Sequence, residues 1–183
     1  MANLAESYET DFQDGHVDEL WENSGRFLNA SSKALVAAPS KRLRANVFRM
    51  PFAEMTLEAS IALDNGTHGG SAGLIIHATE IKQAVYFGYY VAINPAGFVV
   101  FSRLDWDGLK ELVRAPLGTP WRGFHYMRVQ AFEDDLRVFV DDLKRPKIAL
   151  KDWSYAVGYS GVFVNQTGAT FRKFSALSTM SVN

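Results

Sequence analysis

The sequence contains no cysteine among its 183 residues. This absence excludes disulfide bonds, thiolate metal sites and cysteine nucleophiles together. No stretch approaches the run of about 20 apolar residues that a membrane-spanning helix requires, so we expect no membrane partner. The N-terminus shows no basic stretch followed by an apolar one, and no signal peptide is visible. We therefore expect either a cytoplasmic protein or a trimmed or mature exported chain.

The chain also lacks an excess of charge of either sign. It has 19 basic and 20 acidic residues and a formal net charge of −1. Binding to nucleic acid requires basic side chains that neutralise phosphates, so we expect no nucleic-acid partner. Apolar residues make up 48% of the chain and charged residues 21%. These values are typical of a soluble globular protein, and the length predicts one domain over residues 1–183.

Helical periodicity is almost absent, whereas apolar and polar residues alternate along much of the chain. From Met55 to Leu63 every second residue is apolar, which predicts a strand with one buried face. The other strands are predicted at 71–78, 85–94, 98–104, 124–132 and 136–141, with shorter ones at 26–29, 33–37, 46–49, 109–113, 162–165 and 170–177. One short helical turn is predicted near residues 17–22. So many short strands predict an all-β fold, a two-sheet antiparallel β-sandwich or jelly roll, with a closed barrel as the alternative.

No arrangement of residues typical of a metal or cofactor site is found. The four histidines, at positions 16, 68, 77 and 125, form no metal-binding pair, so we predict no metal site and no cofactor. The glycine-rich stretch at 66–70 lacks the Lys-Ser/Thr of a phosphate-binding loop and lies between predicted strands. No nucleophile elbow of a hydrolase is present.

Residues suited to carbohydrate are more prominent. Sugars bind through aromatic rings that cover their C–H faces and through planar polar groups that bond paired hydroxyls. Arg103, Asp105 and Trp106 follow a predicted strand into a loop, where function tends to concentrate. Further aromatic residues in the same part of the sequence are Tyr86, Tyr89, Tyr90, Trp121, Trp153 and Tyr155.

Five short motifs occur in an order that resembles a known superfamily. They are Thr10-Asp11-Phe12, Ala72-Gly73-Leu74-Ile75-Ile76-His77, Gly88-Tyr89-Tyr90-Val91, the hairpin pair Arg128-Val129-Gln130-Ala131 and Val138-Phe139-Val140-Asp141, and Asp152-Trp153-Ser154-Tyr155-Ala156-Val157-Gly158. Together they resemble the concanavalin A-like lectin/glucanase superfamily over nearly the whole chain. The resemblance is closest to the 3-keto-disaccharide hydrolase-type domains and the C-terminal sandwich modules of levanases.

The resemblance implies a concanavalin A-like sandwich that binds carbohydrate, but two departures limit it. His77 stands where the branch often has Arg. The sequence Phe171-Arg172-Lys173-Phe174 stands where the branch often has Phe-Asp-Asn-Phe, and two cations in place of a carboxylate argue against a structural Ca²⁺ there. The Glu-x-Asp-x-(x)-Glu run of the glucanases in the superfamily is also missing, which disfavours conventional retaining glucanase activity.

Three functions are therefore open, and the first is preferred: a non-catalytic module that binds a glycan or oligosaccharide. Its predicted ligand contacts are Glu58, His77, Tyr86, Tyr90, Arg103, Asp105 and Trp106. The second is a glycoside hydrolase or other glycan-processing enzyme on the same scaffold, with Glu58 and Asp105 as the catalytic carboxylates. The third is a sandwich that recognises a protein partner or a second copy of the chain through exposed aromatic residues.

Overall fold

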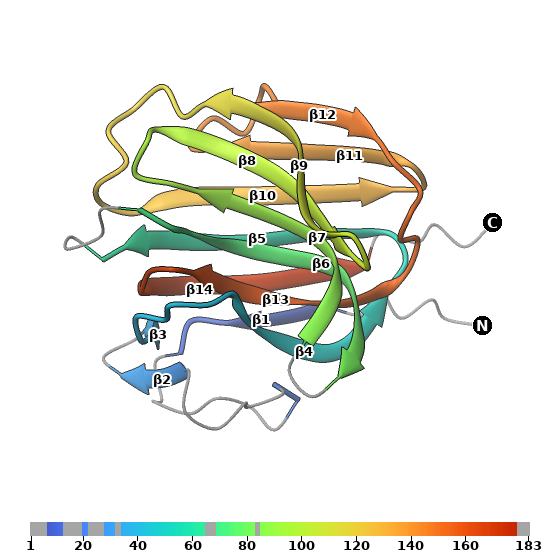
Figure 1. Ribbon diagram of the computed structural model, residues 1–183, viewed down its shortest axis with the longest axis horizontal. Helices are drawn as coiled ribbons and strands as arrows, with labels where there is room; N and C mark the ends of the chain where they lie inside the picture. Colours follow the sequence, from blue (N-terminus) through green and yellow to red (C-terminus); the bar gives the residue numbers. More distant parts are fainter. Residues whose placement is uncertain are drawn as a thin grey trace.

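The computed structural model describes residues 7–12, 20–21, 28–31, 34–64, 69–82 and 85–178, with the backbone alone at 28–31 (Figure 1). Its strands form two antiparallel sheets that pack face to face, so the predicted all-β two-sheet antiparallel sandwich is confirmed. The larger sheet contains β1 (Ser7–Thr10), β2 (Leu28–Ser31), β3 (Ala34–Ala37), β5 (Met55–Leu63), β10 (His125–Phe132), β11 (Asp135–Val140), β12 (Ile148–Lys151) and β14 (Ala169–Ser178). The smaller sheet contains β4 (Arg44–Phe52), β6 (Ser71–Lys82), β7 (Val85–Ile93), β8 (Phe98–Asp105), β9 (Gly108–Pro116) and β13 (Gly158–Asn165).

The strand order brings distant segments together. The larger sheet runs β12-β11-β10-β5-β14-β3-β2, with β1 also paired to β14, and the smaller runs β4-β13-β6-β7-β8-β9. Hairpins join β7 to β8 and β10 to β11, as their turn residues predicted. In the first of these turns Gly97 adopts φ +82, a conformation that glycine allows without steric cost. The described part of the chain contains no helix long and apolar enough to span a membrane.

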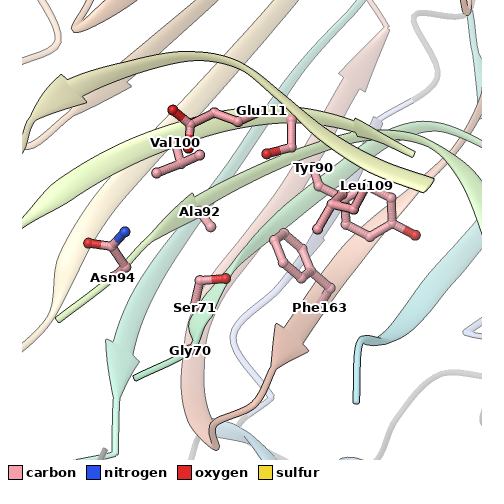
Figure 2. Close-up of a pocket in the computed structure, with 10 residues that line it drawn as sticks. Gly70, Ser71, Tyr90, Ala92, Asn94, Val100, Leu109, Glu111 and Phe163 are labelled. Carbon is pink, nitrogen blue, oxygen red and sulfur yellow. The ribbon is translucent and has the colours of Figure 1, made fainter. Parts of the chain in front are cut away.

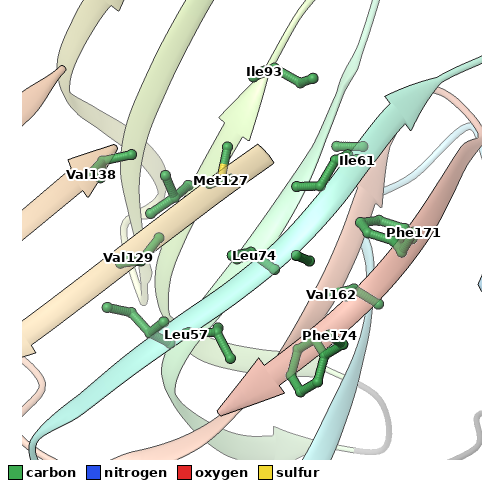
Figure 3. Close-up of a cluster of buried hydrophobic side chains, with 14 of the residues drawn as sticks. Leu57, Ile61, Leu74, Ile93, Met127, Val129, Val138, Val162, Phe171 and Phe174 are labelled. Atoms are coloured by element: carbon green, nitrogen blue, oxygen red, sulfur yellow. The ribbon is translucent and has the colours of Figure 1, made fainter. Parts of the chain in front are cut away.

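The core lies between the sheets and follows from the alternation in the sequence. Leu57 and Ile61 of β5 are fully buried, as are Val129 of β10 and Val138 of β11, and they face Leu74 of the smaller sheet (Figure 3). The polar residues between them point to the outside of the larger sheet, since side chains alternate along a strand. Each large apolar side chain buried in this way contributes roughly 1.5–3 kcal/mol.

The smaller sheet is apolar on both faces. A second buried cluster covers its outer face and includes Ile75, Tyr86, Tyr90, Ala92 and Phe163. Continuous apolar runs in β6 and β7, rather than alternating ones, produce this arrangement. Such runs are typical of strands that are buried on both sides.

Three short segments differ from the predicted elements or lie partly outside the described residues. The strand β12 was not predicted, because its short sequence Ile148–Lys151 lies within a basic segment, yet it pairs with β11 at the edge of the larger sheet. The helical turn predicted near 17–22 lies outside the described residues except for Leu20 and Trp21, and Trp21 forms a β-bridge with Phe48. Residues 26 and 27 of the predicted strand 26–29 are likewise outside them, while Leu28–Ser31 form β2.

Candidate functional site

A cluster of polar side chains lies where β8 meets the loop between β12 and β13. The Arg103 guanidinium is its centre. Its Nε donates to Asp105 Oδ2 at 3.1 Å, and its Nη1 donates to Asp152 Oδ2 at 3.1 Å and to Ser154 Oγ at 2.7 Å. The side chains of Arg103 and Asp152 are 23% and 16% exposed, so the group is held in a half-buried position. The strand and the loop therefore fix one guanidinium at the protein surface.

The loop is fastened to the smaller sheet by a second layer of hydrogen bonds. Tyr89, which lies opposite Arg103 in the β7–β8 register, donates from its hydroxyl to Asp152 Oδ1 at 2.5 Å. The same hydroxyl accepts a bond from the Tyr155 backbone N–H at 3.2 Å, and the Tyr155 hydroxyl donates to the Leu104 carbonyl at 2.9 Å. Tyr89 and Tyr155 thus set the position of Asp152 relative to β8.

These contacts decide the protonation states in the cluster. Burial raises the pKa of Tyr89, and the neighbouring Asp152 carboxylate raises it further. Burial alone would also raise the pKa of Asp152, but hydrogen bonds from Ser154 and Tyr89 together with the Arg103 charge outweigh it, and the net shift is downward. Near neutral pH the cluster therefore holds a neutral phenol, a carboxylate and a guanidinium.

Two tryptophans beside this cluster are almost fully exposed. Trp106 is 84% exposed and Trp153 is 79% exposed. Trp106 follows Asp105 in the β8–β9 turn, and its ring packs edge-on against Phe87 with centroids 4.7 Å apart. Trp153 lies between Asp152 and Ser154, which both bond Arg103. We call this surface the tryptophan patch; it consists of Arg103, Asp105, Trp106, Asp152, Trp153 and Ser154.

A cavity of about 460 Å³ adjoins the patch on its Trp153 side. Its walls come from the β4–β5 turn, the β10–β11 turn and the β12–β13 loop, and they include Glu54, Glu133 and Asp134. The Lys151 ammonium bonds the Asp134 carboxylate at 3.2 Å. A ligand stacked on Trp153 would have hydrogen-bond acceptors within reach in this cavity.

Three of the predicted ligand residues meet in the patch, and three others are buried. Arg103, Asp105 and Trp106 lie together. His77 is 0% exposed and Tyr86 is 1% exposed, so the structure does not support the prediction that these two contact a ligand. His77 occupies a β-bulge between two backbone carbonyls, with Nδ1 2.8 Å from the Tyr155 oxygen and Nε2 2.9 Å from the Ala53 oxygen.

Tyr90 is 2% exposed and lies on the outer face of the smaller sheet, away from the patch. Its hydroxyl donates to the Tyr86 carbonyl at 2.7 Å, so only its ring is available for contact. Burial raises the pKa of Tyr90. Because successive side chains alternate along a strand, Tyr89 and Tyr90 lie on opposite faces of the smaller sheet, and both are buried.

Glu58 belongs to a different surface. It projects from the middle of β5 on the outer face of the larger sheet, where it accepts hydrogen bonds from Tyr126, Arg128 and Ser175. Asp105 lies at the end of β8 in the smaller sheet. The structure therefore does not bring Glu58 and Asp105 together as a pair of carboxylates, because the two strands belong to different layers of the sandwich.

Asp152 and Ser154 were not among the predicted ligand residues. Their partner Arg103 lies 49 and 51 residues away in the sequence, so no local pattern connects them. One signal was present: the dipeptide Asp-Trp occurs twice, at Asp105-Trp106 where β8 ends and at Asp152-Trp153 directly after β12. Within the described residues no group of three or more histidine or acidic side chains is placed to hold a metal ion.

No family model matches the chain, and no curated protein matches it in sequence. Solved structures do match. The carbohydrate-binding module CBM66 from Bacillus subtilis is similar over 87% of this chain and 96% of its own, with 16% identity and a TM-score of 0.77. The exoplasmic/lumenal domain of VIP36, in a Ca²⁺/Man3GlcNAc-bound form, matches over 90% of this chain and 85% of its own, with 12% identity and a TM-score of 0.65.

A GH43 protein from Bacillus licheniformis is similar over 93% of this chain, with 11% identity and a TM-score of 0.70, but the match spans only 39% of that longer chain. At such identities the likeness establishes the fold alone. The chain has the two-sheet antiparallel β-sandwich fold that it shares with these structures.

Proposed function

We propose that this protein is a carbohydrate-binding module and that the tryptophan patch is its glycan site. The observation that carries the proposal is that two exposed indoles stand beside groups bonded to one guanidinium. A large exposed indole is costly in water, and two of them beside one polar cluster mark a candidate interaction site. Trp106 and Trp153 would stack on the C–H faces of sugar rings.

The polar centre of the patch suits sugar hydroxyls. Arg103 and Asp105 offer planar donors and acceptors side by side, and Asp152 and Ser154 hold the Arg103 guanidinium in place. Because the guanidinium is already fixed by three hydrogen bonds, less conformational entropy is lost when a ligand binds. A neutral polyol can use the remaining donors and acceptors without placing a net charge in the site.

The structural neighbours support this class of function. CBM66 is a carbohydrate-binding module, and VIP36 was solved with Man3GlcNAc bound. The motif order of the present chain resembles the sandwich modules of levanases and the 3-keto-disaccharide hydrolase-type domains. Fructans are therefore the first ligands to test, followed by β-glucans, mannose-containing oligosaccharides and disaccharides.

The test is a glycan-array screen of the purified chain, followed by calorimetric titration of any hit. We expect Trp106→Ala and Trp153→Ala each to weaken binding at least tenfold, about 1.4 kcal/mol. Phe132→Ala is the matched control, because Phe132 is an exposed aromatic residue on the larger sheet, and it should bind as the parent does.

Two outcomes would replace the proposal. Release of shorter sugars during incubation would indicate an enzyme, whose carboxylates would have to differ from the separated pair Glu58 and Asp105. Failure of the folded chain to bind any glycan would favour the use of Trp106 and Trp153 in contact with a protein partner or a second copy of the chain.

A further inference from the structure

A second cavity lies on the outer face of the smaller sheet, apart from the tryptophan patch (Figure 2). Its volume is about 290 Å³. Its floor and walls include Tyr90, Ala92 and Phe163, and its rim includes Asn94, Ser102 and Glu111. We propose that this trough is an independent binding site for a single neutral sugar ring. It shares no lining residue with the patch, so the module would have two sites.

The trough is produced by missing side chains in one row across the sheet. The strand registers place Phe163, Gly73, Ala92 and Val100 side by side on β13, β6, β7 and β8. Gly73 contributes no side chain and Ala92 only a methyl group, so the sheet surface is hollowed between the larger side chains of Phe163 and Val100. A Cβ at position 73 would overlap the Val91 carbonyl oxygen. The close approach of the two backbones therefore requires glycine there.

Aromatic rings stand over this gap and are held rigidly. Tyr90 and Phe163 meet edge to face, with ring centroids 4.9 Å apart and an interplanar angle of 80°. Both residues are 2% exposed. The bond from the Tyr90 hydroxyl to the Tyr86 carbonyl removes the freedom of that side chain. Because so little of either ring is exposed, the two rings supply a rigid apolar base for the trough rather than an open stacking face, and they need no further ordering when a ligand binds.

Hydrogen-bonding groups surround the apolar floor. Ser102 lies in register between Tyr90 and Glu111 and is 8% exposed, and no hydrogen bond within the described residues uses its hydroxyl. Asn94 Oδ1 accepts a bond from the Phe98 N–H at 3.1 Å, which fixes the amide and leaves its NH₂ group as a donor. A few placed polar groups beside an apolar surface are typical of small-ligand sites.

The charge and the volume of the trough restrict the kind of ligand that it can bind. Among the described residues that line it, Glu111 is the one that carries a charge, and Arg114 bonds both carboxylate oxygens, at 2.6 and 2.8 Å. This pairing leaves no uncompensated charge to attract a uronic acid or an amino sugar. The volume lies at the lower end of the range for small-molecule pockets, which are roughly 300–1,000 Å³, so one ring fits better than an extended chain.

The proposal can be tested by two-dimensional ¹H–¹⁵N NMR during titration with D-glucose, D-galactose, D-mannose and D-fructose. Each sugar is taken to roughly 50 mM, because a ligand of about twelve heavy atoms is expected to bind in the millimolar range. At least one sugar should shift the amide signals of Ser71, Ala92, Asn94 and Ser102. These shifts should persist in Trp106→Ala and in Trp153→Ala.

Two variants fill or alter the trough. Ala92→Leu places a larger side chain in the open row and should weaken this binding at least tenfold, while Ala149→Leu on the exposed edge strand β12 is the matched control and should have no effect. Ser102→Ala removes one hydroxyl and should weaken binding about threefold to tenfold, even if Ala92→Leu perturbs the sheet.

The outcomes separate this site from the tryptophan patch. Shifts confined to residues around Trp106 and Trp153 would overturn the trough proposal and leave the proposed function intact. Trough shifts that survive both Ala92→Leu and Ser102→Ala would also overturn it. Trough shifts lost in these variants, in a protein whose Trp106→Ala variant binds every arrayed glycan normally, would support the trough and contradict the patch.

Discussion

The outer face of the larger sheet is polar and crossed by ion pairs, whereas the outer face of the smaller sheet is apolar and covered with buried rings. On the larger sheet, Glu58 of β5 bonds Arg128 of β10, and Asp135 bonds Arg137 within β11. On the smaller sheet, Tyr90, Ala92 and Phe163 occupy the equivalent outward positions. On the outer face of the larger sheet these polar side chains bond one another, whereas the outer face of the smaller sheet contains a cavity.

This difference between the two outer faces follows from the pattern of apolar residues in the strands of each sheet. Where side chains alternate, as in β5, the outward residues are polar and pair with their neighbours across strands. Where the strand is apolar throughout, as in β7, the outward residues must be covered or must line a site. The following experiments change the two faces separately, in order of decreasing expected effect.

The largest effect is expected from a methyl group added under the trough. Gly73→Ala would place a Cβ against the Val91 carbonyl and the Ala92 backbone of β7 and force β6 and β7 apart, and we expect a loss of roughly 3 kcal/mol in the free energy of unfolding. Urea denaturation measures it. Gly69→Ala is the control, because a Cβ at position 69 meets nothing within 4 Å, and it should change stability little. Equal stability of the two variants would contradict the tight packing inferred for the smaller sheet.

A second experiment uses pH to protonate His77, a buried residue of the smaller sheet. Burial lowers the pKa of His77 below its usual 6.5, although its contacts to the Tyr155 and Ala53 carbonyls oppose the shift. The unfolded chain therefore binds the proton more tightly, so His77 contributes stability above pH 6.5 that is lost as the pH falls through its lowered pKa. We expect the free energy of unfolding to decrease between about pH 7 and pH 5.

The variant His77→Asn tests whether His77 causes this pH dependence. Asparagine is chosen because it tolerates the positive φ of +50 at this position. The variant should be roughly 2 kcal/mol less stable at pH 7, since it disturbs a buried hydrogen-bonded group. Its stability should vary less between pH 7 and 5 than that of the parent. An unchanged pH slope would show that another group is responsible.

On the larger sheet a smaller effect is expected. Glu58→Gln removes the negative charge that faces Arg128 and should cost about 1 kcal/mol. Burial and the bond to Glu58 raise the pKa of Tyr126 to about 12, so the variant should lower this pKa, which ultraviolet absorbance detects. Glycan binding should be unchanged. If binding were lost, the original prediction that Glu58 contacts the ligand would be supported and its assignment to a purely structural role would be wrong.

The smallest effect is expected at the exposed pair on β11. The hydrogen bond from Arg137 lowers the pKa of Asp135, and Arg137→Ala should return it toward its usual 3.8. Because the pair is exposed and screened by salt, the midpoint of urea denaturation should stay within error of the parent. NMR titration of the Asp135 carboxyl measures the pKa change. A marked loss of stability would mean that the ion pairs of this face contribute more than their exposure suggests.

Local patterns were sufficient for most of the fold. The boundaries of β5 were predicted correctly because strict alternation ends at turn residues on both sides. The strand β12 escaped prediction because a four-residue strand that follows Lys147 and ends at Lys151 carries little pattern, and its pairing with β11 is decided by tertiary contacts. For the site, Arg103, Asp105 and Trp106 could be found from their place where a strand ends in a turn.

The rest of the site depends on packing that a single sequence does not reveal. Asp152 and Ser154 join Arg103 only because the β12–β13 loop folds back onto β8. His77 and Tyr86 were also predicted to contact a ligand, and both lie in strands of the smaller sheet. In the smaller sheet both faces are buried, so a polar or aromatic residue in these strands is not thereby accessible.

The most direct test of the central claim is calorimetric titration of the parent chain, Trp106→Ala, Trp153→Ala and Phe132→Ala with the best ligand from a glycan array. We expect the parent and Phe132→Ala to bind the glycan with equal affinity, and each tryptophan variant to bind it at least tenfold more weakly. The midpoint of urea denaturation of each tryptophan variant should equal that of the parent. Equal affinity of all four proteins would contradict the assignment of the glycan site to the tryptophan patch.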